Sequence, residues 1–312
     1  MRKTKVTVLG GSGMLGSMLV DWLSRDPNLS VTATVRTSAW LTLGKERIPE
    51  TEWRLFELGD EATMARQLES IGPADWVLNA IGLTKPYTHD DNGLEIQRAI
   101  LGNASFPYLL GQYYGERGGQ ILQIATDCVY SGLKGDYLEK DVHDALDVYG
   151  KTKSLGEPLL PNVHCLRSSI IGPEPKSFVF LLEWFRRQPL NSRLSGFLNH
   201  WWNGLTTFHF AKLCHAIIQN HFPLPKLQHL VPTGTVSKYK LLCGFAKSFS
   251  RPDIDIAAKD AAQAVNRTLA TDNRSLNDKL WKLAGYPQRP PTCEEMVDEL
   301  SAFPYRFAER ET

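Results

Sequence analysis

The chain has 312 residues, and its 35 basic and 34 acidic side chains leave a formal net charge of +1 at pH 7. Because charges of both signs are interspersed, the chain has no basic field of the kind that binds nucleic acid or an anionic membrane surface. We expect neither a signal peptide nor a transmembrane helix, because glycines interrupt the N-terminal apolar stretch and no later apolar run is long enough to span a bilayer.

Short β-branched runs alternate with helical patterns in the first half of the chain. Strands are predicted over residues 6–9, 31–35, 53–56, 76–79, 120–125 and 163–166. Helices are predicted over residues 14–23, 61–71, 94–114 and 149–160. Strands that alternate with helices favour right-handed crossovers, so we expect an α/β fold with a Rossmann-type, doubly wound parallel sheet.

After Pro173 the pattern changes, because prolines cut the chain into shorter pieces. Helices are predicted over residues 178–187 and 205–218, a strand over 228–231, a helix capped by Ser237, and further helices near 278–284 and 293–303. We therefore expect residues 1–172 to form a dinucleotide-binding domain. Residues 173–312 would form a smaller mixed α/β domain, mainly for substrate, with parts of about 205–235 returning to the first domain.

A glycine-rich turn follows the first predicted strand and opens the first predicted helix. Gly10 permits the tight turn, Gly13 lets the backbone approach a pyrophosphate, and Gly16 lets the helix pack on the strand. The amides and dipole of the helix N-terminus favour the bound phosphates. The cofactor-binding residues predicted in this turn are Gly10, Ser12, Gly13, Met14, Leu15 and Gly16.

Arg36 ends the second predicted strand, about 20 residues after the last glycine of the turn. An acidic side chain there would bind the adenosine ribose hydroxyl of NAD, whereas an arginine pairs with the 2′-phosphate of NADP. The residue favours NADPH, with NADH as the less favoured cofactor.

Tyr149 and Lys153 are four residues apart in a predicted helix, so their side chains share one face. Thr126 directly follows the predicted strand 120–125 and thus lies at the carboxyl edge of the sheet, where ligands bind in open parallel sheets. A Tyr-x-x-x-Lys spacing alone is common on surface helices. Its place after the fifth strand of a dinucleotide fold makes these three residues candidates for catalysis.

Further motifs extend this pattern over nearly the whole chain. They are Gly10-x-x-Gly13-x-x-Gly16, Asn79-Ala80, Asn103-Ala104-x-x-Pro107, Thr126-Asp127-x-Val129-Tyr130, Tyr149-Gly150-x-x-Lys153 with Gly156-Glu157, and Arg167 ahead of Gly172-Pro173. Together they resemble the extended short-chain dehydrogenase/reductases. Within that superfamily the Thr-Asp-x-Val segment is most similar to dTDP-4-dehydrorhamnose reductase and related nucleotide-sugar 4-keto reductases.

The resemblance implies an NADPH-dependent oxidoreductase that reduces the 4-keto group of a nucleotide-linked deoxysugar for polysaccharide or glycan precursor synthesis. Tyr149 would donate a proton to the keto oxygen, and Thr126 would bind that oxygen. Lys153 would stabilise the phenolate and hold the nicotinamide ribose. Three residues would line the cofactor after the fourth strand: Asn79, Ala80 and Ile81.

Cys128 separates this chain from one related class. Nucleotide-sugar 4,6-dehydratases are similar in fold but carry Asp-Glu after the catalytic threonine, whereas here Asp127 is followed by a cysteine. The resemblance therefore implies reduction rather than removal of water.

The expected substrate-binding residues are Thr126, Asp127, Asn199, Trp201 and Trp202. The adjacent tryptophans suit stacking on a base or sugar face, with an amide nearby for hydroxyl groups. The alternative interpretation is that both tryptophans only pack between the two domains.

Two other functions remain open at the level of sequence. One is a nucleotide-sugar epimerase that keeps its cofactor bound. The other is a non-catalytic, dinucleotide-binding regulatory subunit, because a methionine adenosyltransferase regulatory subunit looks similar to these reductases.

The five cysteines are scattered and form no Cys-x-x-Cys pair, which favours a reduced, cytoplasmic setting. We expect no metal site. The expected partner is a nucleotide-sugar substrate, without nucleic acid or membrane, and the sequence is compatible with a homodimer.

Overall fold

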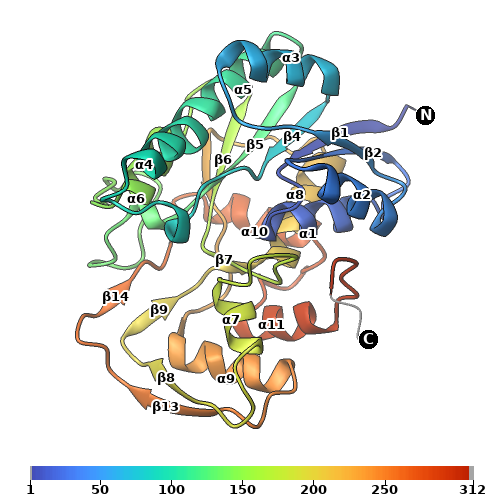
Figure 1. The fold of residues 1–312 in the computed structure, drawn as a ribbon. Coiled ribbons are helices and arrows are strands. Elements are labelled where there is room, and N and C mark those ends of the chain that lie inside the picture. The colour runs from blue at the N-terminus through green and yellow to red at the C-terminus, as the bar shows by residue number, and fades with distance from the viewer. Residues whose placement is uncertain (1, 309–312) are drawn as a thin grey trace.

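The apolar runs of the first half form one parallel sheet in the computed structural model, which describes residues 2–308 (Figure 1). Its strand order is β11-β6-β5-β4-β1-β2-β3, and every neighbouring pair is parallel. The strands are β1 (Thr4–Leu9), β2 (Leu29–Val35), β3 (Glu52–Leu55), β4 (Trp76–Asn79), β5 (Gln120–Ala125), β6 (Val163–Arg167) and β11 (Leu227–His229). The order reverses between β1 and β4, which places a ligand-binding crevice at their carboxyl ends. The predicted Rossmann-type α/β fold is confirmed.

Helices cover both faces of this sheet (Figure 1). They are α1 (Met14–Leu23), α2 (Ser38–Arg47), α3 (Glu61–Ile71), α4 (Gly93–Ala99), α5 (Phe106–Gly115), α6 (Val148–Leu155) and α8 (Thr207–Gln219), with short turns η1 (Lys85–Tyr87), η2 (Ile100–Ser105) and η3 (Asp127–Val129). The prediction of one helix over 94–114 was wrong in one respect, because the π-helical turn η2 separates α4 from α5.

The polypeptide after β6 builds small sheets and the remaining helices. These elements are β7 (Ile170–Ile171), α7 (Leu181–Arg186), β8 (Arg193–Phe197), β9 (His200–Trp202), β10 (Leu205–Thr206), β12 (Val236–Ser237), α9 (Lys238–Ser248), β13 (Asp255–Lys259), β14 (Val265–Asn266), α10 (Arg274–Leu283) and α11 (Cys293–Ala302). Pairing is β7 with β10, β9 between β12 and β14, and β8 with β13. Ser237 caps α9 as predicted, its side chain accepting from the backbone N–H of Lys240.

One hydrophobic core joins the two halves of the chain. Val8 of β1, Leu19 of α1, Phe210 of α8 and Val297 of α11 all belong to it. Trp22 and Phe208 meet edge to face across α1 and α8, with ring centroids 5.2 Å apart. Thus α8 packs beside α1 although nearly 200 residues separate them, and β11 joins the sheet beside β6. The domain boundary near residue 172 stays a prediction.

Within residues 2–308, we find no helix with the length and apolar character needed to cross a membrane.

Candidate active site

Thr126 stands where β5 ends and η3 begins, at the carboxyl edge of the sheet. Its hydroxyl accepts a hydrogen bond from the Cys128 N–H at 3.2 Å and contacts the Asp127 carboxylate at 3.2 Å. The Thr126 side chain also lies close enough to the Tyr149 hydroxyl to lower the pKa of that phenol. The structure therefore joins the phenol and the threonine hydroxyl at one point of the sheet edge.

Lys153 lies one turn after Tyr149 on α6 and points back toward β5. Its ammonium donates to the carbonyl oxygen of Ile124 at 2.6 Å, and the side chain is buried. The helix sits close to its neighbours, because a Cβ on Gly150 would lie 2.5 Å from the Cys128 carbonyl and one on Gly156 only 1.7 Å from the backbone of η2. The glycines thus let α6 place both side chains against the end of β5.

Burial shifts the pKa values of the ionisable side chains in this site so that each neutral form is favoured. It raises the pKa of Tyr149, an effect that the nearby Thr126 side chain opposes. It lowers the pKa of Lys153 to about 8, against the attraction of the Glu157 carboxylate. It also raises the pKa of the Cys128 thiol to about 12, so this thiol is not a thiolate nucleophile at neutral pH.

The glycine turn has the shape of a phosphate cradle. Gly10 has φ +84°, and a Cβ on Gly16 would lie 2.1 Å from the Gly10 carbonyl oxygen. Helix α1 has neither a side-chain cap at Gly13 nor an acidic residue in its first turn. The first amides of any helix have no acceptor within the helix, and so the N–H groups of Met14 and Leu15 are available to an anion. Ser12 is buried beside them. The turn fits the pyrophosphate of a dinucleotide.

Asn79, Ala80 and Ile81 pass directly beside this turn. A Cβ on Gly10 would touch Ala80 and Ile81 at 3.1–3.2 Å. The Asn79 amide donates to Gln123 of β5 at 2.8 Å and its oxygen accepts from the Ile81 N–H at 3.2 Å. The side chain of Asn79 therefore holds the strand end in place, leaving the backbone to face the crevice. Arg36 is exposed at the end of β2.

Asp127 is buried beside Thr126 at the carboxyl edge of the sheet, and burial raises the pKa of its carboxyl group. The positive charges of Arg267 and Lys238 oppose that rise. In turn, burial lowers the pKa of Lys238, while the charge of Asp127 favours its ammonium form. Lys238 opens α9 in the second half of the chain, and only its place on a predicted helix was visible in the sequence. Two cations from the C-terminal half thus face the candidate catalytic residues.

The remaining predicted substrate residues lie on or beside β9. The side-chain amide nitrogen of Asn199 donates to the Ala261 carbonyl oxygen, and its oxygen accepts from the Ala261 N–H. Trp202 is buried in the core and donates its indole N–H to the Ser169 hydroxyl at 2.9 Å, whereas Trp201 is 45% exposed. Trp202 therefore has a packing role, and only Trp201 presents an accessible ring.

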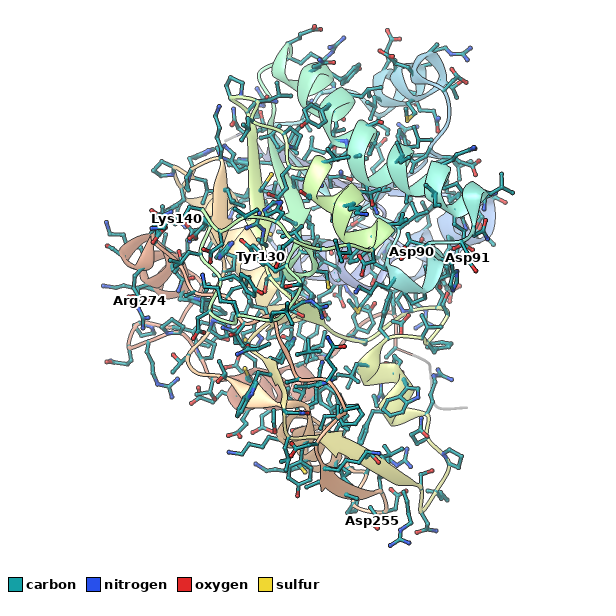
Figure 2. All side chains as sticks on the ribbon, turned by 90° about the vertical axis from the view of Figure 1, so that its left-hand side faces the viewer. Asp90, Asp91, Tyr130, Lys140, Asp255 and Arg274 are labelled. Atoms are coloured by element: carbon teal, nitrogen blue, oxygen red, sulfur yellow. The ribbon has the colours of Figure 1, made fainter. Side chains whose placement is uncertain are left out.

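A cleft of about 320 Å³ opens at Tyr149 from the side of α4 and α6. Its lining includes Lys85, Asp147, Asp90 and Asp91, with a 2.7 Å ion pair between Lys85 and Asp147. Asp90 and Asp91, labelled in Figure 2, are exposed, whereas Tyr130 is fully buried. The acidic lining suits sugar hydroxyl groups better than a diphosphate.

A model of the family described as the RmlD substrate binding domain matches residues 4–302. The spore coat polysaccharide biosynthesis protein SpsK of Bacillus subtilis is 30% identical over 159 residues, 50% of this chain and 48% of that protein. Methionine adenosyltransferase 2 subunit beta of Bos taurus is 26% identical over 148 residues, 43% of each. The chain thus spans about half or less of the length of these two relatives.

Among solved structures, dTDP-4-dehydrorhamnose reductase of Bacillus anthracis in complex with NADP superposes with a TM-score of 0.69 at 17% identity. The superposition covers 96% of this chain and 98% of that one. At this identity, the likeness shows the fold.

Proposed function

The chain belongs to the RmlD substrate binding domain family, and on that basis we propose that it reduces the 4-keto group of a nucleotide-linked deoxysugar with NADPH. The observation that carries the proposal is that Thr126, Tyr149 and Lys153 come together at the carboxyl end of β5. A structural neighbour is a dTDP-4-dehydrorhamnose reductase in complex with NADP, and a relative is a polysaccharide biosynthesis protein, which supports the same class of reaction.

The cofactor supplies a hydride to the keto carbon when it is bound. Tyr149 then gives its phenolic proton to the keto oxygen, so that the carbonyl becomes an alcohol. Because burial raises the pKa of Tyr149, the phenol is protonated and ready to donate at neutral pH. Thr126 holds the keto oxygen close to that proton and stabilises the negative charge developing on it.

Lys153 stabilises the phenolate left after proton transfer. Its ammonium lies in a buried site, where a charge acts more strongly than in water. Loss of the Lys153 proton would remove this stabilisation. The same ammonium would also donate to the ribose hydroxyls of the nicotinamide half.

NADPH is the proposed cofactor because Arg36 directly follows β2, with Thr37 and Ser38 rather than an acid beside it. A guanidinium binds a phosphate group, such as the 2′-phosphate of NADPH, with two parallel hydrogen bonds. The proposed substrate is a nucleotide sugar, whose diphosphate would face Lys238 and Arg267. Its sugar hydroxyls would point to the acidic cleft by Tyr149.

The test is an assay of the purified protein with NADPH and a set of dTDP- and UDP-linked 4-keto-6-deoxy sugars. The proposal predicts oxidation of NADPH in a 1:1 ratio to the sugar alcohol, and loss of that activity in Tyr149→Phe. No turnover with any of the keto sugars, in protein that binds NADPH, would contradict it.

The same assay separates the two alternatives. Catalysis without added NADPH, in protein purified with tightly bound oxidised cofactor, would indicate an epimerase. The likeness to methionine adenosyltransferase 2 subunit beta is the reason for the second alternative, a regulatory subunit. That role predicts cofactor binding without NADPH oxidation, in the wild type and in Tyr149→Phe alike.

A further inference from the structure

Lys176 reaches the glycine turn from the other half of the chain. It lies in the segment between β7 and α7, which runs near the N-terminal end of α1 in Figure 1. Its ammonium donates to the Ser12 hydroxyl at 2.7 Å, although 164 residues separate the two. It also lies over the ring of Trp40, 4.9 Å from the centroid. Trp40 is in the first turn of α2, directly after the end of β2.

A second cation, Arg36, lies close enough to Lys176 to act on its charge. Burial lowers the pKa of Lys176, and the positive charge of Arg36 lowers it further. Within residues 2–308, neither side chain has a carboxylate at ion-pair distance, whereas Arg167 has Glu157 and Arg306 has Asp21. Partial burial of the Lys176 ammonium beside a second cation is unfavourable, and a bound anion would offset that cost.

The segment that carries Lys176 is held in an uncommon conformation. Ser177 and Phe178 both have positive φ, at 70° and 53°. An aromatic residue in this region is rare and is retained where its surroundings enforce it. Here the buried Glu174 carboxylate accepts from the Phe180 N–H at 2.7 Å, which closes the segment on itself. The strained turn therefore fixes where Lys176 points.

From this geometry we propose that Lys176 is a determinant of cofactor choice, which binds the adenosine-ribose 2′-phosphate of NADPH together with Arg36. The proposal rests on NADPH as the cofactor proposed above. The 2′-phosphate of a dinucleotide lies at the carboxyl end of the second strand of the fold, which is where Arg36 and Trp40 stand. Lys176 then closes the site from the opposite side, with its Ser12 contact placing it between that phosphate and the glycine turn.

A lysine provides a single point charge and can serve the ribose phosphate or the pyrophosphate. The contact with Ser12 alone would fit either anion. The position over Trp40 and the field of Arg36 both lie on the ribose side, so we assign Lys176 to the 2′-phosphate. The two assignments differ in what they predict for NADH, which has the pyrophosphate and lacks the 2′-phosphate.

The test measures dissociation constants of NADPH, NADH and 2′,5′-ADP by calorimetry for the wild type and four variants. Lys176→Gln and Arg36→Gln each remove one charge, and Lys176→Arg keeps it. Lys240→Gln removes the charge of an exposed lysine on α9 as a matched control. Thermal unfolding of each variant reports whether the fold is intact.

We expect Lys176→Gln to weaken NADPH and 2′,5′-ADP by roughly tenfold, the usual loss for one charge-assisted hydrogen bond, and to leave NADH within about twofold. Lys176→Arg restores most of the affinity, and Lys240→Gln matches the wild type. Equal weakening of NADPH and NADH by Lys176→Gln would overturn the assignment in favour of the pyrophosphate. An NADPH preference that depends on Arg36 and not on Lys176 would also overturn it.

These outcomes are distinct from failure of the proposed reaction. Protein that shows the Lys176-dependent preference for NADPH but reduces no keto sugar would refute the reaction and leave this site in place. A wild type that binds NADH as tightly as NADPH would contradict both this site and the proposed cofactor.

Discussion

Replacement of Lys153 by methionine should remove both the activity and its dependence on pH. Methionine has a similar length and no charge, so it fills the same buried space beside Ile124 without the ammonium that stabilises the Tyr149 phenolate. Burial lowers the pKa of Lys153 to about 8. At that value about nine-tenths of the side chains are protonated at pH 7 and about one-tenth at pH 9.

The expected profile follows from these fractions. If the ammonium is required, kcat/KM for NADPH is constant below pH 7 and falls about tenfold for each pH unit above 8, because kcat/KM reports the groups of the unliganded protein. Lys153→Met should lose about 100-fold or more in kcat/KM at pH 7, within the usual range for one acid–base group. The control is Lys151→Met, which removes an exposed lysine from the same helix.

Stability should change with pH in the opposite sense. The pKa of Lys153 is lower in the folded protein than in the unfolded chain, so the unfolded chain binds more protons between about pH 8 and pH 10.5. The free energy of unfolding contributed by this group therefore increases as pH rises through that window. Urea unfolding of the wild type minus that of Lys153→Met isolates the term. A rate that stays flat to pH 10 in the wild type, or a Lys153→Met variant with the wild-type profile, would refute this account of the site.

Three further predictions follow from the same contacts. Tyr149→Phe should reduce kcat by about 100-fold or more, because the phenol gives the proton, and should leave the NADPH dissociation constant within about twofold. Steady-state kinetics and calorimetry measure the two effects, with Tyr108→Phe, at an exposed tyrosine, as the control. A kcat of Tyr149→Phe within about tenfold of the wild type would exclude Tyr149 as the donor. Glu157→Gln should destabilise the fold by about 3–5 kcal/mol in urea unfolding, because it leaves the fully buried Arg167 without its carboxylate partner. The same variant should move the kcat/KM midpoint to lower pH, because the Glu157 charge favours protonated Lys153; an unchanged midpoint would argue against that coupling.

The central sheet was predictable because each of its main strands has a local sequence pattern that predicts a strand. β1, β2 and β4 are buried, β-branched or apolar runs that turn signals delimit, and their spacing left room for crossover helices. The glycine turn was predictable for the same local reason, since backbone conformation at Gly10 and close packing at Gly16 require glycine.

Helix α2 was not predicted, because it lacks the apolar periodicity on which the prediction depends. Gly44 is its one buried residue, where a Cβ would lie 2.5 Å from the Trp53 ring. The strands β8 and β13 are short, largely exposed and paired across about 60 residues, so they left no pattern in the local sequence.

The residues of the candidate active site were predictable only where a short segment of sequence has a recognisable pattern. Tyr149 and Lys153 share a helix face, and Thr126 follows a recognisable strand. By contrast, Lys176 and Lys238 reach the site through the tertiary fold, and no spacing in the sequence links them to Ser12 or Asp127. Trp202 shows the converse, because a residue type that suits ligand stacking is used for packing in the core.

The most direct test of the central claim is the transfer of deuterium from NADPH deuterated at both C4 positions to a nucleotide-linked 4-keto-6-deoxy sugar, followed by mass spectrometry and NMR of the product. Our account predicts one deuterium on carbon 4 of the sugar for each NADPH oxidised, and no transfer in Tyr149→Phe. NADPH that binds but transfers no deuterium to any sugar of this class would contradict it.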